Sequence, residues 1–557
     1  MLSYEIAAVQ KAAFLGIKDT NPLILSSMGM GRVLHPGNLE ANDYLSYIDT
    51  YNSHCHRKTD EEAKNYIQSL MPFRGDKPVW LTEYSTGSFS MNNHDKDDLP
   101  IQEMKSLAEM VPMIFARNIF RSVNEIFYFY FFVYVEVKGE FYGLARQKDL
   151  AMTPGYNAIA AVGRILGNAH NPEKLDNLPG FAEGYKFQTS SREKKTETIV
   201  LWTQSSENTF TYSVPEGSEI YDVIGRQVKA SGKNIKLSQS PLFIVAPATV
   251  NEPVAKSFKP SPAASVCPIV MNTILADIYK NEASDYLAIP AEQDFTLPLD
   301  IYNFSDHTST GSIKIQPDQA AGMTEIIFKL DIAPWQHIIS NINLRFPRAK
   351  DSGNETFRLS FTGDFDKTGK SIMTINVKPV TLKLGPDDKR ITMPNSDNPS
   401  DWHINIIAGS EMETARKGNW NIFSYDFKDT VNKVIKSVWA APSLEVSAFS
   451  SAYPDAVAID LKQIEGPKLK LAFNVVEENG SAYIGMMNVE EDALRSDEGA
   501  TVVIPFQTMS NPKYRKQDDN GKLDLDSLKA VELAFWTEPN SKVTLSFKKM
   551  SWVYFSK

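Results

Sequence analysis

The pattern of apolar and polar positions changes once along the chain, near residue 185. Before that point, apolar runs of strand length alternate with segments whose apolar residues recur at helical spacing. After it, short alternating runs are separated by turns rich in Gly, Asn, Asp, Ser and Pro, which is typical of antiparallel sheets. The pattern therefore predicts an α/β region followed by all-β domains.

The α/β region is expected to open with a helix over residues 3–18, where four apolar residues fall on one helical face: Ile6, Val9, Ala13 and Ile17. Four strand–helix units follow, with the strands LILSS, IDTYNSH, VWLTEY and EIFYFYFFVYV. Thr59 and Glu62 form a capping box, and Thr153–Pro154 begins a last helix that Gly167 ends.

Buried parallel strands with helical crossovers predict either a (β/α) barrel or an open doubly wound sheet. No GxGxxG or Walker loop follows any strand, so the barrel is favoured. A closed barrel needs eight units, and four units leave two sheet edges exposed. Self-association of the chain through these edges is one expected consequence.

The predicted fold is a partial TIM barrel followed by three antiparallel β-sandwich domains. The predicted boundaries are 1–180 for the barrel portion, 181–250 for a small sandwich packed on it, 251–282 for a linker, 283–383 for a fibronectin-like sandwich and 384–557 for a jelly roll.

Composition and net charge exclude several classes of function. The 557 residues include 58 Lys and Arg against 68 Asp and Glu, a net charge of −10, and no sustained basic run. Binding to nucleic acid or to an anionic membrane is therefore not expected. No apolar run reaches the length of a membrane span, and the first residues lack the pattern of a signal peptide. Cys55 and Cys267 have neither disulfide-framework nor zinc-site spacing, and no cofactor is expected.

Two strand ends carry candidate chemistry. Glu83 lies where the strand VWLTEY meets a polar loop. This position suits a nucleophile that attacks an anomeric carbon. The alternatives are that Glu83 caps the loop or pairs with an arginine. His54 and His56 share one face of the preceding strand and could orient Glu83, contact substrate hydroxyls or serve a structural role. A metal site would need a third ligand, which no nearby pattern supplies, so no metal is expected.

Aromatic residues near these ends could stack on a sugar ring, with core packing as the alternative. The candidates are Trp80 and Tyr84 beside Glu83, Tyr130 and Phe131 on the fourth strand, and Trp402, Trp420 and Trp439 in the last domain.

The segment VWLTEYSTGS resembles the seventh-strand nucleophile motif of the retaining glycoside hydrolases with a (β/α)8 barrel, and residues 3–168 resemble units five to eight of that barrel in the correct order. The resemblance implies that Glu83 is the nucleophile, that His54 is the sixth-strand histidine and that Asn52 lies near the active-site wall. His56 stands where the family often has a tyrosine that touches the nucleophile. The usual stacking tryptophan of strand eight is replaced by Phe131 or a neighbour.

The resemblance also implies a general acid/base glutamate at the end of the fourth barrel strand, and this chain lacks that strand. The chain alone is therefore expected to be a poor catalyst. It is also expected to be a fragment of a longer secreted enzyme. Its partner would be a polysaccharide or oligosaccharide, and its location extracellular or at the cell surface. Two alternatives stay open: a non-catalytic carbohydrate-binding protein, and an adhesion or spacer protein built of sandwiches.

Overall fold

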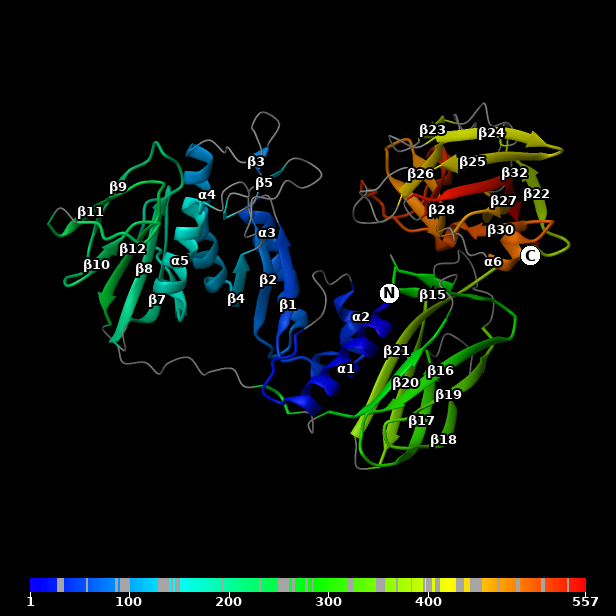
Figure 1. The fold of residues 1–557 in the computed structure, drawn as a ribbon, viewed down its shortest axis with the longest axis horizontal. Coiled ribbons are helices and arrows are strands. Elements are labelled where there is room, and N and C mark those ends of the chain that lie inside the picture. Colours follow the sequence, from blue (N-terminus) through cyan, green and yellow to red (C-terminus); the bar gives the residue numbers. More distant parts are fainter. Residues whose placement is uncertain are drawn as a thin grey trace. The chain divides into compact units, whose positions relative to one another are not determined.

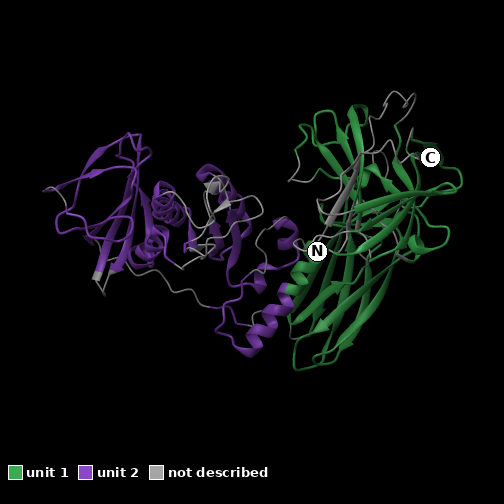
Figure 2. Cartoon of the chain, turned by 45° about the horizontal axis from the view of Figure 1, so that its top comes forward, with its two compact units in different colours: residues 1–9, 267–557 green, residues 10–266 purple. Residues whose placement is uncertain are grey.

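The computed structural model forms two compact units, residues 1–9 with 267–557 (unit 1) and residues 10–266 (unit 2), which are coloured separately in Figure 2. The structure describes residues 1–27, 35–56, 59–85, 89–90, 101–128, 140–141, 144–145, 151–191, 194–229, 232–248, 260–262, 266–275, 279–282, 284–318, 324–346, 356–366, 369–381, 383–393, 396, 403–405, 411–426, 435–440, 453–467, 470–486, 491–511, 516–537 and 540–556.

Unit 2 contains a three-stranded parallel sheet in the order β1-β2-β4, with helices in the connections between its strands (Figure 1). The elements up to residue 166 are α1 (Ser3–Thr20), α2 (Pro36–Ala41), η1 (Leu45–Tyr47), β1 (Tyr51–His56), α3 (Asp60–Leu70), η2 (Met71–Phe73), β2 (Val79–Ser85), β3 (Phe89–Ser90), α4 (Ile101–Phe120), β4 (Val123–Tyr128), β5 (Glu140–Phe141) and α5 (Pro154–Leu166). Of the expected strand at 23–27, the structure shows one parallel bridge, from Ser27 to Thr50. The α/β pattern of this segment is thus confirmed, while the wider barrel stays a prediction.

One face of the parallel sheet is covered by α3 and α4. The side chains of Cys55, Leu81 and Tyr84 form a continuous apolar core there with Ile67 of α3 and Ile114 of α4. The expected cap of α3 is present, because Thr59 Oγ1 accepts a hydrogen bond from the Glu62 backbone N–H at 3.2 Å. Burial on this face leaves the other face of the sheet for polar side chains.

The buried face of α1 differs from the expected one. Val9 is 57% exposed and Ala13 is also exposed, whereas Phe14 and Leu15 are buried. Phe14 packs edge-on against Tyr47 with ring centroids 5.9 Å apart. The large aromatic ring therefore sets the rotation of the helix, which the spacing of smaller apolar residues did not reveal.

Antiparallel strands complete unit 2. A five-stranded sheet in the order β10-β12-β8-β7-β6 packs one face on α4 and α5 and the other against the two-stranded antiparallel sheet β11-β9. Arg117 of α4 donates two hydrogen bonds to Glu183 of β7, at 2.8 and 2.6 Å, and its guanidinium lies 5.2 Å from the Trp202 ring centroid. The strands are β6 (His170–Lys174), β7 (Ala182–Ser191), β8 (Lys194–Thr203), β9 (Phe210–Ser213), β10 (Glu219–Tyr221), β11 (Asn234–Leu237) and β12 (Leu242–Pro247).

Unit 1 contains two sandwiches. The first has the sheets β13-β16-β19 and β14-β15-β21-β20-β17-β18 around one apolar core. Its pair β15–β21 is parallel, which corrects the expectation of a purely antiparallel sandwich. Its strands are β13 (Ile269–Thr273), β14 (Lys280–Asn281), β15 (Tyr286–Pro290), β16 (Phe295–Asn303), β17 (Ser309–Pro317), β18 (Ile326–Ile332), β19 (His337–Leu344), β20 (Phe357–Phe365) and β21 (Gly369–Val380).

The second sandwich is antiparallel throughout its described pairs, with the sheets β24-β25-β32-β27-β30, extended by β22, and β23-β26-β31-β28-β29. Its elements are β22 (Lys389–Thr392), β23 (His403–Asn405), β24 (Glu411–Lys417), β25 (Trp420–Asp426), β26 (Ile435–Ala440), β27 (Ala456–Glu465), β28 (Lys470–Glu477), β29 (Ala482–Met486), α6 (Glu491–Arg495), β30 (Ala500–Pro505), η8 (Phe506–Thr508), η9 (Leu525–Ser527), β31 (Leu528–Thr537) and β32 (Lys542–Tyr554). Within the described ranges, no helix has the length and apolar character needed to cross a lipid bilayer.

Candidate active site

A bulge in β2 determines which way Glu83 points. Ser53 of β1 pairs with Leu81, but the next residue, His54, pairs with Glu83, so Thr82 is an extra residue in β2. Without the bulge, strict alternation would turn Glu83 to the face opposite Trp80. The inserted residue instead brings Glu83 onto the same face as Trp80, away from the helices.

The same bulge moves Tyr84 to the opposite face. Leu81 and Tyr84 are three residues apart, yet both are at most 1% exposed and both lie in the core beneath α3 and α4. Burial raises the pKa of Tyr84, and its side chain hydrogen-bonds to Asn118 of α4. This corrects the expectation that Tyr84 contacts a substrate, since that expectation assumed regular alternation next to Glu83.

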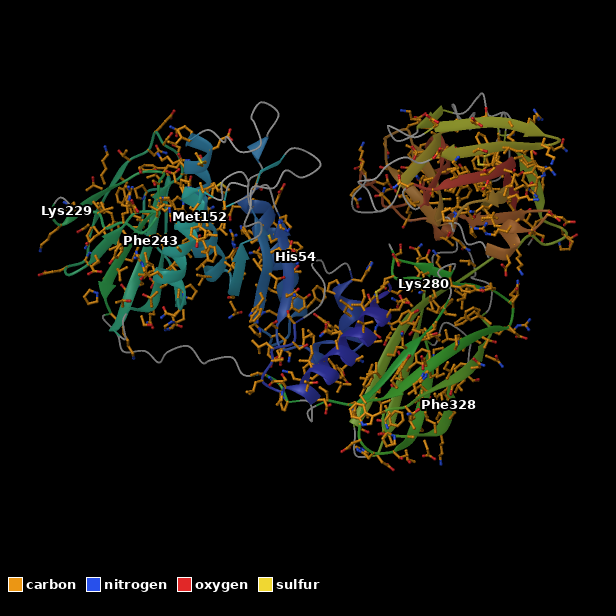
Figure 3. All side chains as sticks on the ribbon, in the orientation of Figure 1. His54, Met152, Lys229, Phe243, Lys280 and Phe328 are labelled. Carbon is orange, nitrogen blue, oxygen red and sulfur yellow. The ribbon has the colours of Figure 1, made fainter. Side chains whose placement is uncertain are left out.

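Two imidazoles converge on one carboxylate oxygen. His54 Nδ1 lies 3.2 Å from Glu83 Oε2, and His56 Nε2 lies 3.1 Å from the same atom. The side chains of His54, His56 and Glu83 are 32%, 37% and 27% exposed, so solvent reaches the group. Figure 3 marks His54 on the parallel sheet. Both histidines therefore lie within reach of Glu83, and their role in orienting it stays a prediction.

The strand that carries the histidines is held on its other side. Cys55 is fully buried in the helix-covered core, and the Ser53 hydroxyl hydrogen-bonds to that of Tyr66 in α3. Just before β1, the buried Asp49 pairs with Lys18 at 2.6 Å and accepts backbone hydrogen bonds from Ser26 and Ser261. These contacts fix the backbone of β1, so the positions of its imidazoles are set by the core rather than by a loop.

The arrangement allows two kinds of chemistry. A carboxylate whose Oε2 is held by two imidazoles can present Oε1 as a nucleophile. The same three side chains also bring three potential ligand atoms within 4.8 Å of one another, a spacing at which they could hold one metal ion. No residue close to the histidines in the sequence supplies the third ligand, because Glu83 comes from the adjacent strand.

The other candidate substrate-binding residues lie in several parts of the chain. Asn52 pairs with Trp80 in the sheet, and Asn52 is buried while Trp80 is partly exposed. Trp420 is partly buried beneath Lys548, whose Nζ lies 5.9 Å from the ring centroid. Trp439 belongs to β26. Tyr130, Phe131 and Trp402 lie outside the described residues. Sequence reasoning missed the bulge at Thr82 and the Lys18–Asp49 pair, and no sequence signal marks the bulge.

Comparison with known proteins gives one family match. Residues 40–156, which include β1, β2 and Glu83, match the family model described as glycosyl hydrolase catalytic core. A search of curated proteins found no significant match.

Several solved structures are similar to parts of the chain. One is the family 11 carbohydrate-binding module of a cellulosomal cellulase of Clostridium thermocellum, at 16% identity over 31% of this chain and 96% of the module, with a TM-score of 0.22. A GH39 β-xylosidase from Caulobacter crescentus has 12% identity over 44% of this chain and 62% of the xylosidase, with a TM-score of 0.28. Wild-type BuGH86 in complex with neoagarooctaose has 11% identity over 69% of each chain, with a TM-score of 0.28.

Proposed function

We propose that this protein is a glycoside hydrolase that acts on a polysaccharide or oligosaccharide by a retaining mechanism, with Glu83 as the nucleophile. The observation that carries the proposal is the pair of imidazoles on Glu83 Oε2, at 3.1 and 3.2 Å, within the segment that matches a glycosyl hydrolase catalytic core. We extend the proposal to an extracellular or cell-surface location, which rests on the resemblance to secreted glycoside hydrolases alone.

In the proposed reaction, Glu83 Oε1 attacks the anomeric carbon while the bond from that carbon to the leaving oxygen breaks. The leaving oxygen takes a proton from a general acid, and the product is a covalent glycosyl ester of Glu83. Water then attacks the same carbon from the vacated side and gives its proton to the group that had protonated the leaving oxygen. The bond from the carbon to Glu83 Oε1 breaks, and the sugar leaves with its original configuration. In this scheme the two imidazoles beside Oε2 fix the plane of the carboxylate and leave Oε1 free to attack.

Activated substrates test the nucleophile separately from the general acid. A 2,4-dinitrophenyl leaving group departs without protonation, so hydrolysis of 2,4-dinitrophenyl β-glucoside, β-xyloside and β-galactoside needs Glu83 but not the acid. That the chain by itself hydrolyses unactivated glycosides poorly stays a prediction. We expect release of dinitrophenolate by the native chain, its loss in Glu83→Gly, and its partial return when azide supplies the missing nucleophile.

The control for this experiment is Glu207→Gly, which removes an exposed carboxylate from a turn in the same unit. It should leave release unchanged. The azide product gives the decisive result, because attack by azide in place of Glu83 forms a glycosyl azide of inverted configuration. Equal release by the native chain and Glu83→Gly would refute the role of Glu83. Glycan binding in a pull-down with no hydrolysis of any activated substrate would instead favour the carbohydrate-binding alternative.

A further inference from the structure

We propose that His54, His56 and Glu83 form a binding site for one divalent transition-metal ion, with Zn²⁺ as the preferred ion. The ligand atoms are His54 Nδ1, His56 Nε2 and a carboxylate oxygen of Glu83. The site does not depend on the proposed function, because it follows from the positions of three donor atoms alone.

The distances suit coordination of a small ion. Both imidazole nitrogens lie 3.1–3.2 Å from Glu83 Oε2. With metal–ligand bonds of about 2.0–2.1 Å, the edge between two ligand atoms of a tetrahedron is about 3.3 Å. These two separations are within about 0.2 Å of that edge, and all three ligand atoms lie within 4.8 Å of one another, so side-chain adjustments would bring them around one ion. Because β1 and β2 are packed against α3 and α4, the backbone already holds the ligands at this spacing.

The donor set selects the class of metal. Two imidazole nitrogens and one carboxylate oxygen favour Zn²⁺ and its first-row neighbours over Mg²⁺ and Ca²⁺, which prefer oxygen ligands alone. The three side chains are 27–37% exposed, so an ion enters directly from solvent. Three protein ligands leave the fourth tetrahedral position for water or for another solute.

Metal binding and glycoside hydrolysis would exclude each other. A Zn²⁺ ion bound to Glu83 withdraws electron density from the carboxylate and occupies the space beside it, so the carboxylate can no longer attack a sugar. Zn²⁺ would therefore act as a reversible inhibitor of the activity proposed above.

The test is titration of the full chain, freed of metal with EDTA and dialysed, with ZnCl₂ in an isothermal calorimeter. We expect one Zn²⁺ per chain, and at least about tenfold weaker binding in each of His54→Gln, His56→Gln and Glu83→Gln. The matched control is His307→Gln, which removes a surface histidine whose Nδ1 lies 3.0 Å from the Asp306 carboxylate, and it should bind as the native chain does. CoCl₂ added to the same proteins gives a second readout, because cobalt in a tetrahedral site absorbs visible light.

Circular dichroism and thermal unfolding without metal show whether each variant is folded. Unchanged Zn²⁺ binding in the three folded site variants would overturn the proposal, as would no binding by the native chain. Hydrolysis of the activated glycosides is measured separately in the presence of EDTA. Failure of hydrolysis with Zn²⁺ binding intact refutes only the proposed function, and hydrolysis without Zn²⁺ binding refutes only the metal site.

Discussion

The buried pair between Lys18 and Asp49 gives the sharpest test of how the site is supported. Both side chains are fully buried, and Lys18 Nζ donates to Asp49 Oδ2 at 2.6 Å and to the Ile24 carbonyl at 2.7 Å. The substitution Lys18→Met removes the cation but keeps much of the side-chain volume. Among the described residues, the buried Asp49 carboxylate then keeps the backbone N–H groups of Ser26 and Ser261 as its hydrogen-bond donors.

Breaking one partner of a buried ion pair costs about 3–5 kcal/mol. We expect Lys18→Met to destabilise unit 2 by this amount, and Asp49→Asn to do so by a similar amount. The double variant contains no buried charge at these positions, so its cost should fall below the sum of the two single costs by about 1–3 kcal/mol. The matched control is Lys64→Met, which breaks an exposed pair with Glu61 and should cost less than about 0.5 kcal/mol.

Hydrogen–deuterium exchange measures these costs locally. Peptides that cover residues 44–56 report on the start of β1, and peptides from β20 and β21 report on unit 1, whose exchange should not change. A cost below about 1 kcal/mol for Lys18→Met, or strict additivity of the two single variants, would refute the assignment of this pair as the anchor of β1.

The pH dependence of the same pair has a defined sign. Lys18 and the backbone N–H groups of Ser26 and Ser261 overcome the effect of burial and hold the pKa of Asp49 below its ordinary value. The pair therefore contributes fully above the ordinary carboxyl pKa of about 3.9, and the contribution is lost as the pH falls through the lowered pKa. Lys18→Met should remove this acid-dependent part of the exchange protection in β1.

Three further predictions concern other contacts. Arg117→Met breaks the two hydrogen bonds to Glu183 and should lower the free energy of unfolding of unit 2 by about 3 kcal/mol, measured in urea. A decrease below about 1 kcal/mol would contradict the described packing of α4 on β7. Tyr84→Phe should lower the free energy of unfolding by about 1 kcal/mol, because the hydrogen bond to Asn118 is lost, and should leave dinitrophenolate release unchanged. A large loss of release would mean that Tyr84 faces the substrate. Burial lowers the pKa of Lys378 to about 8. Between pH 8 and about 10.4 the unfolded chain therefore binds more protons than the folded chain, and the stability of unit 1 should rise with pH. Lys378→Met should abolish this rise, which is measured as the midpoint of urea unfolding.

Much of the α/β segment follows from local sequence signals. The capping box at Thr59 and Glu62, Pro154 at the start of α5 and the apolar run ending at Glu83 each depend on residues that are close in the chain. Such signals act over one helical turn or one strand, so they can be read without knowing the packing. The placement of Glu83 at a strand end is of this kind.

The errors arose where packing between distant residues decides the outcome. The contact of Phe14 with Tyr47 sets the rotation of α1, and the extra residue Thr82 in β2 reverses the faces of Glu83 and Tyr84. The third donor of the histidine cluster lies 27 residues beyond His56 and reaches it only through the pairing of β1 with β2. A pattern along one strand carries no information about its neighbour, so these features required the structure.

Peptide mass mapping after treatment with 2,4-dinitrophenyl 2-deoxy-2-fluoro-β-glycosides of glucose, xylose and galactose would identify the nucleophile. The fluorine slows hydrolysis of the glycosyl ester, so the covalent intermediate accumulates on the nucleophile. We expect one fluoroglycosyl group per chain, on the peptide that contains Glu83, and no label on Glu83→Gln. A label on a different carboxylate, or equal labelling of Glu83→Gln, would contradict this expectation.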